Sequence, residues 1–80
     1  MVNYFFDFRA DELFLLDEDG EDLPDADAAH REALQAFTQA VRDTLMQGRS
    51  GQRFAVEVRD ELGPVLEITG VIASKIVRRQ

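Results

Sequence analysis

The sequence of 80 residues contains no cysteine, no tryptophan, two prolines and a single histidine. Without cysteine, the chain has no disulfide and no thiolate ligand for a metal ion. One histidine without a second histidine or a cysteine also cannot build an ordinary zinc site, so we expect no metal and no cofactor. A domain of this size buries only about 60% of the surface that its unfolded chain exposes. Oligomerisation is therefore the remaining way to supplement a small core.

Basic residues are scarce as well. Lys and Arg together number nine against sixteen Asp and Glu, which gives a formal net charge of −7. A field of this sign repels phosphate and anionic lipid, so we expect no direct nucleic-acid partner and no membrane partner. The sequence also lacks a long apolar run and an initial basic segment, which predicts neither a transmembrane helix nor a secretion signal and favours a cytoplasmic location.

The charges are unevenly distributed along the chain. Between residues 7 and 27 a single base, Arg9, accompanies ten carboxylates: Asp7, Asp11, Glu12, Asp17, Glu18, Asp19, Glu21, Asp22, Asp25 and Asp27. The last six residues carry three bases and no acid: Lys75, Arg78 and Arg79. The simplest interpretation is a set of solvated loops at one end and a polar tail at the other.

The first part of the chain has the alternation of a strand with one buried face. Over residues 2–9, Tyr4, Phe6 and Phe8 fall on one side, and we place them in the core. The next three residues suit a hairpin although they include no glycine. A second strand is predicted over residues 13–16, which are apolar on both faces, and such a strand is normally covered on both sides.

A helix is predicted from Ala26 to about Met46. Asp25 is a suitable N-cap, because its carboxylate accepts from the free amides of the first turn, and Gly48 suits the left-handed position beyond the helix end. One stripe of the helix is apolar and should face a sheet: Ala26, Ala29, Ala33, Leu34, Phe37, Ala40, Val41 and Leu45.

Two further strands are predicted, over residues 53–60 and 64–69, joined by a tight turn at Gly63. Together these elements predict a single α+β domain over residues 1–70 with the order ββαββ. Its four-stranded antiparallel sheet, in the spatial order 2-1-3-4, would carry one long helix on one face. Residues 71–80 are predicted to be a basic C-terminal tail, either strand or short helix.

The predicted sheet leaves apolar side chains on the face without the helix, which is more than a monomer normally exposes. The cover would be residues 71–77 folding back, or a second copy of the domain. We therefore expect a homodimer or another protein partner to dock through this sheet face, with a candidate interface of Phe5, Leu13, Phe14, Leu15, Leu16 and Val65.

Several segments of this sequence match a known family. They are Tyr4–Asp7, the segment from Asp17 to Asp25 with its Gly-x-x-Leu-Pro-Asp core, Ala28–Leu34 with its Glu-Ala-Leu, and Val56–Gly63. Over roughly residues 3–69 the chain resembles the short bacterial proteins of the domain-of-unknown-function family 6894. The chain departs from the family at Ala10-Asp11, where a hairpin glycine is common, and in its basic C-terminus. The resemblance implies a fold unit and no mechanism.

The acidic segment from Asp17 to Asp22 is predicted to be a turn, with Gly20 free to adopt a positive φ. Asp17, Asp19 and Asp22 are candidates for a weak Ca²⁺ or Mg²⁺ site. The segment does not match an EF-hand, since the sixth position from Asp17 is not glycine and the twelfth is not glutamate. A solvated turn is the favoured interpretation.

Other candidate sites are weaker. His30 lies within the apolar stripe, where an imidazole hydrogen-bonded at the margin between helix and sheet is favoured over a catalytic one, because the hydroxyls of Ser50 and Ser74 lie in a loop and in the tail. The glycine-rich segment at 48–51 ends a helix, so the dipole has the wrong sign for phosphate. A basic patch beside aromatic strand residues would suit RNA, but those aromatics are needed for the core. The bases concerned are Arg49, Arg53, Arg59, Lys75, Arg78 and Arg79.

Three functions follow as hypotheses. The first is a non-catalytic module that self-associates or binds a protein. The second is a regulator similar to HicB-type antitoxins, with a toxin partner. The third is a weak metal-binding or small-ligand-binding domain centred on His30 and the acidic turn. We expect no enzymatic activity and no catalytic residues.

Overall fold

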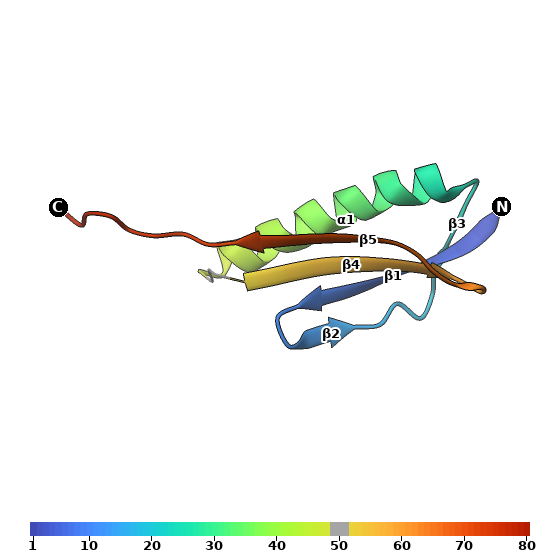
Figure 1. The fold of residues 1–80 in the computed structure, drawn as a ribbon, viewed down its shortest axis with the longest axis horizontal. Helices are drawn as coiled ribbons and strands as arrows, with labels where there is room; N and C mark the ends of the chain where they lie inside the picture. The colour runs from blue at the N-terminus through green and yellow to red at the C-terminus, as the bar shows by residue number, and fades with distance from the viewer. Residues whose placement is uncertain (49–51) are drawn as a thin grey trace.

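The computed structural model describes residues 1–48 and 52–80. In these ranges the chain forms one helix and five strands (Figure 1). In chain order they are β1 (Val2–Ala10), β2 (Leu13–Leu15), β3 (Glu21–Leu23), α1 (Ala26–Met46), β4 (Gln52–Asp60) and β5 (Gly63–Ile72). The predicted α+β class is confirmed.

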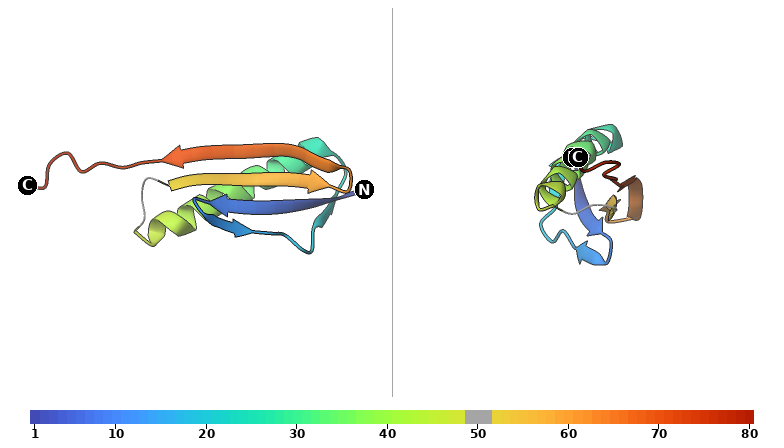
Figure 2. Two further views of the ribbon diagram at one scale, coloured as in Figure 1. Left: turned by 60° about the horizontal axis from the view of Figure 1, so that its bottom comes forward. Right: turned by 90° about the vertical axis from the view of Figure 1, so that its left-hand side faces the viewer.

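The sheet is antiparallel throughout and has the order β2-β1-β4-β5 (Figure 2). This is the predicted order, with β4 and β5 as the third and fourth predicted strands. The structure adds β3, which the sequence predicted to be part of a turn. β1 pairs with β2 through its last three residues and with β3 through its first three. β3 forms because β2 stops at Leu15 and leaves Val2–Tyr4 of β1 without a partner.

The helix has the predicted bounds and caps. The Ala28 amide donates to Oδ1 of Asp25 at 2.9 Å, which satisfies one of the free donors of the first turn. At the other end, Gly48 has a φ of +81° and its amide donates to the Leu45 carbonyl, as in a left-handed helix terminus.

The core lies between α1 and one face of the sheet (Figure 2). Ala29 and Ala33 of the helix are completely buried, and their small side chains allow the helix to approach the strands closely. Val56 and Val58 of β4 lie beneath them. Not all of the predicted stripe is buried, since Leu34 is exposed.

The hairpin between β1 and β2 forms without glycine because Asp11 adopts a φ of +52°. Its amide donates to the Arg53 carbonyl at 2.8 Å, and its Oδ1 accepts from the Arg53 amide at 2.9 Å. Aspartate tolerates the left-handed conformation better than most residues. Hydrogen bonds to β4 therefore support a residue other than glycine at this position.

The C-terminal stretch does not fold back on the sheet. Val71 and Ile72 continue β5, and residues 73–80 have no regular secondary structure and extend beyond the end of the sheet (Figure 1). The first of the two predicted covers is thus not formed. Within the described residues, no helix combines the length and apolar character needed to cross a bilayer.

The close approach of α1 to the sheet gives a test of the core. Ala33→Leu should destabilise the fold by about 1–3 kcal/mol, because a larger side chain at this fully buried position forces the helix away from β4. Urea unfolding measures the change. Ala36→Leu, at an exposed position of the same helix, is the control and should change the free energy of unfolding little.

Candidate functional site

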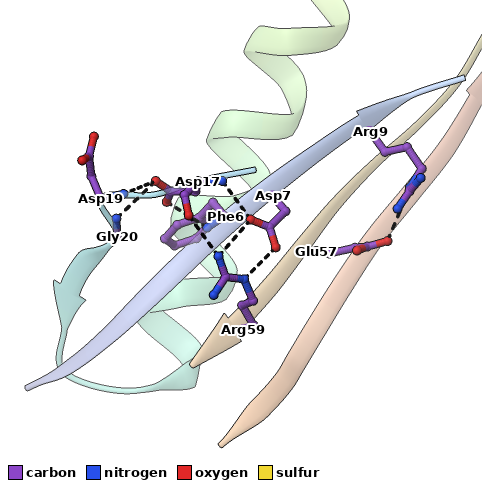
Figure 3. Close-up of polar contacts among 8 residues, drawn as sticks. All are labelled: Phe6, Asp7, Arg9, Asp17, Asp19, Gly20, Glu57 and Arg59. Carbon is purple, nitrogen blue, oxygen red and sulfur yellow. Dashed lines mark hydrogen bonds and ion pairs between the residues drawn. The ribbon is translucent and has the colours of Figure 1, made fainter. Parts of the chain in front are cut away.

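A partly buried ion pair lies on the sheet face opposite the helix. Asp7 of β1 is only 5% exposed, and Nε of Arg59 from β4 donates to its Oδ2 at 2.9 Å (Figure 3). A buried carboxylate without a cation costs several kcal/mol, so Arg59 is required by the burial of Asp7. Two strands far apart in the sequence are joined by this pair.

The same pair holds the segment between β2 and β3 against the sheet. The Asp17 amide donates to Oδ1 of Asp7 at 2.9 Å, and Nη2 of Arg59 donates to the Asp17 carbonyl at 3.0 Å. The Asp17 carboxylate in turn accepts from the Phe6 amide of β1, and from the amides of Asp19 and Gly20 (Figure 3). The Asp17 carboxylate therefore accepts from the Phe6 amide in place of the carbonyl of a neighbouring strand.

Two features of this segment favour glycine at position 20. Its φ is +73°, and a Cβ atom there would lie 2.5 Å from Oδ1 of Asn3 and 2.9 Å from Cε1 of Phe5. The positive φ that the sequence predicted for Gly20 is confirmed. The additional close approach to β1 was not predicted.

The hydrogen bonds to Asp17 set its protonation. Burial alone would raise the pKa of its carboxyl, but the amides of Phe6, Gly20 and Asp19, together with the Arg59 guanidinium, outweigh burial. The pKa of Asp17 is therefore held below its ordinary value of 3.8. The carboxylate is already occupied by the protein's own donors.

Guanidinium groups also cover the aromatic residues of this face. Arg59 lies over the Phe5 ring at 4.4 Å from its centroid, and Arg9 lies over Phe14 at 4.7 Å. Arg9 also pairs with Glu57 at 3.7 Å (Figure 3). The face that was expected to be apolar therefore presents mainly charged groups.

The predicted interface residues are divided among three places. Phe5 and Phe14 lie under guanidinium groups, and Val65 is half-buried on β5, two strands away from β1. Leu13 and Leu15 pair with Ala10 and Phe8, on the side of the sheet that carries the helix but at its edge. We call four consecutive residues along this edge the β2 patch, and each of them is 42–55% exposed although neighbours within β2 alternate between the two faces of the sheet: Leu13, Phe14, Leu15 and Leu16.

The sheet face without the helix contains two open hollows. One, of about 430 Å³, is lined by residues that include Asp7, Arg59 and Val65. The other, of about 460 Å³, lies towards Arg53, and both are bordered by Glu57 and Glu67. The charged groups of Asp7, Arg59 and Glu57 are engaged with one another or with Arg9, whereas Glu67 and Arg53 form no ion pair with another described residue.

The remaining predicted candidates are not brought together. The described residues contain no group of three acidic, histidine or cysteine side chains that would hold a metal ion, and the Asp17 oxygens accept amides instead. His30 is exposed and makes no hydrogen bond to another described residue, so the marginal position predicted for it is wrong. Ser74 lies in the extended tail. Arg49, Ser50 and Gly51 fall outside the described residues.

The polar network of Asp7, Asp17 and Arg59 was not predicted from the sequence. A signal was present, because Asp7 interrupts an aromatic strand between Phe6 and Phe8. Its partner could not be identified without the register, which places Arg59 opposite Phe5 and diagonal to Asp7.

Fold and site together define a small α+β domain with a charged sheet face and an apolar edge strand. A family model, Domain of unknown function (DUF6894), matches residues 3–71. The chain belongs to this family, which confirms the resemblance seen in the sequence. The comparisons with curated proteins and with solved structures found no significant match. The HicB-type antitoxin and ligand-binding hypotheses therefore remain predictions.

The ion pair generates one prediction. Arg59→Met should lower the free energy of unfolding by about 3 kcal/mol, because it leaves the buried Asp7 carboxylate without a cation. Arg53→Met is the control, since the Arg53 side chain is exposed and pairs with no other described residue. Adding Asp7→Asn to Arg59→Met should recover part of the loss. Equal effects of the two arginine substitutions in urea unfolding would contradict this role.

The lowered pKa of Asp17 generates a second prediction for this site. A carboxyl whose pKa is lower in the folded than in the unfolded state stabilises the fold above the unfolded value, near pH 4, and loses this effect as the pH falls through the folded pKa. The difference in unfolding free energy between the wild type and Asp17→Asn should therefore be largest at neutral pH and shrink on acidification. Glu18→Gln, at an exposed neighbour, should follow the wild type across the titration. A difference that is independent of pH would argue against the hydrogen-bonded carboxylate.

Proposed function

We propose that the chain is a non-catalytic protein-binding module that docks its partner along edge strand β2. The observation that carries the proposal is the β2 patch, with four consecutive large apolar side chains that are 42–55% exposed. A single exposed leucine on a small domain is ordinary, but four exposed apolar side chains along one edge strand are characteristic of an interaction site.

The backbone of β2 supports the same proposal. Among the described strands β2 pairs only with β1, so its outer edge has free amides and carbonyls. Natural proteins usually protect such an edge with charge or with proline, whereas this one is apolar. An extended segment of another protein would add to it as a strand, with the leucines giving side-chain contacts.

The charge around the patch indicates the chemistry of the partner. Asp11 and Glu12 precede the β2 patch, and Glu18 and Asp19 follow it, and all four are exposed. We therefore commit to an extended apolar segment that is flanked by Lys or Arg residues. Basic flanks would match the acidic surroundings of the patch and accelerate association.

The rest of the charged face supports binding rather than catalysis. Asp7 and Asp17 are engaged by Arg59 and by backbone amides, and Glu57 is paired with Arg9. These carboxylates hold the fold together and leave no free acid–base pair among them. The cytoplasmic location expected from the sequence stays a prediction.

A peptide library displayed on phage tests the proposal directly. Peptides selected on the wild-type chain should have apolar centres with basic flanks, and they should lose binding to Leu13→Asp/Leu15→Asp by tenfold or more, roughly the loss of one buried apolar side chain. Leu62→Asp is the matched control, because Leu62 is 93% exposed in the turn between β4 and β5. It should leave binding unchanged.

Two results would overturn the proposal. One is that no peptides are enriched. The other is that the selected peptides bind the β2 variant as well as they bind the wild type. The circular dichroism spectra of both variants establish that each is folded before binding is compared.

A further inference from the structure

The other edge of the sheet is formed by β5, and it is longer than β2. β5 spans ten residues and pairs only with β4 among the described strands, so one whole side of its backbone is free. A free edge of this length is a template for another strand. This edge lies on the opposite side of the sheet from the β2 patch.

Three carboxylates lie in one row across the sheet and end at this edge. In the strand register Asp7 faces Glu57, and Glu57 faces Glu67 of β5. Asp7 is paired with Arg59 and Glu57 with Arg9, whereas Glu67 forms no ion pair with any residue that the structure describes. Like charges directly opposite one another are destabilising, so the row lacks a base at the β5 end.

The chain supplies a base in the segment that continues β5. All sixteen acids of the sequence lie within residues 1–67, while residues 73–80 contain Lys75, Arg78 and Arg79. This tail extends in line with β5 and away from its own sheet (Figure 1). Ile76 and Val77 within it are exposed. A basic, apolar, extended segment thus lies directly beyond an acidic edge.

We propose that β5 and the tail pair antiparallel with β5 and the tail of a second copy, about a two-fold axis at Val71. Each residue after Val71 then faces the partner residue that lies equally far before it. Lys75 faces the partner's Glu67 and supplies the missing base at the end of the carboxylate row. Val77 faces the partner's Val65 on the same side of the sheet, and Ile76 faces the partner's Leu66 on the helix side.

The choice of axis follows from these pairs. An axis at Ile72 would place Lys75 opposite the partner's Thr69 and leave the partner's Glu67 facing Val77. An axis at Gly70 would place Lys75 opposite the partner's Val65. Of these three axes, only the one at Val71 pairs Lys75 with an acidic residue of the partner and also pairs Ile76 and Val77 with apolar ones.

An apolar hollow near the axis supports the same arrangement. It has a volume of about 470 Å³ and lies between the second half of α1 and the end of β5, with Phe37, Val41 and Leu45 on the helix side and Ile72 on the strand side. Because Ile72 is next to the axis residue, the hollows of the two copies would meet there. The dimer would have one continuous sheet with both helices on the same face.

Cysteine cross-linking tests the register, because the chain has no cysteine of its own. Residues directly opposite in an antiparallel pair have Cα atoms about 4.5–5.5 Å apart, within the range that a disulfide spans. Val71→Cys should therefore form a covalent dimer under mild oxidation. The exposed controls Leu62→Cys and Leu15→Cys should form about tenfold less covalent dimer. Their thiols are not held opposite one another in the dimer, so the local concentration of thiol is lower.

Charge reversal tests the pairing of Lys75 with the partner's Glu67. Glu67→Lys or Lys75→Glu alone should weaken the dimer about tenfold or more in sedimentation equilibrium, because each change affects two symmetric pairs. The two substitutions together should restore the wild-type dissociation constant to within about threefold. Glu67→Lys also removes the repulsion from Glu57, so its loss of dimer should occur without loss of folded monomer.

The results that would overturn the inference are distinct from those that bear on the β2 patch. A wild-type chain that stays monomeric from micromolar to submillimolar concentration would overturn it, as would a double charge reversal that does not restore the dimer. Preferential cross-linking through Leu15→Cys would indicate that two copies associate through the β2 patch and not through β5. Failure of peptide binding at the β2 patch would leave the dimer through β5 unaffected.

Discussion

The burial of Asp7 determines much of what surrounds it. A carboxylate on a face without a helix would ordinarily stay in water, but here the segment between β2 and β3 closes over it and Arg59 neutralises it. The same guanidinium lies over the Phe5 ring, while its Nε and Nη2 donors are directed at Asp7 and at the Asp17 carbonyl. One ion pair thereby joins β1 to β4 and anchors the acidic segment.

This arrangement moves the available binding surface from the faces of the sheet to its edges. One face is covered by α1, and on the other Arg59 and Arg9 shield the aromatic rings. What stays open is the backbone and the apolar side chains of β2 and of β5. A small domain with two such edges is suited to pairing with other chains, since strand addition requires only a free edge and matching side chains.

The sequence predicted the parts of the fold that local chemistry decides. Asp25 as N-cap, Gly48 beyond the helix and the alternation of β1 and β4 each act within a few residues, and all three were confirmed. The β2 patch was also found, since an apolar run is visible without the fold. The ion pair of Asp7 with Arg59 was not, because it depends on a register between segments 52 residues apart. An alternating pattern gives the face of a residue but not its neighbour across the sheet.

Amide hydrogen exchange, followed as the protein concentration is raised, tests the central claim that this chain binds through its sheet edges. We predict that the outward-facing amides of β5 and those of residues 73–79 gain protection with increasing concentration, while the exchange of Leu13–Leu16 does not change. Because both edges are read in one experiment, the measurement identifies which of them a second copy occupies. Protection that appears only at β2, or at the amides of the charged face around Asp7 and Arg59, would contradict the account.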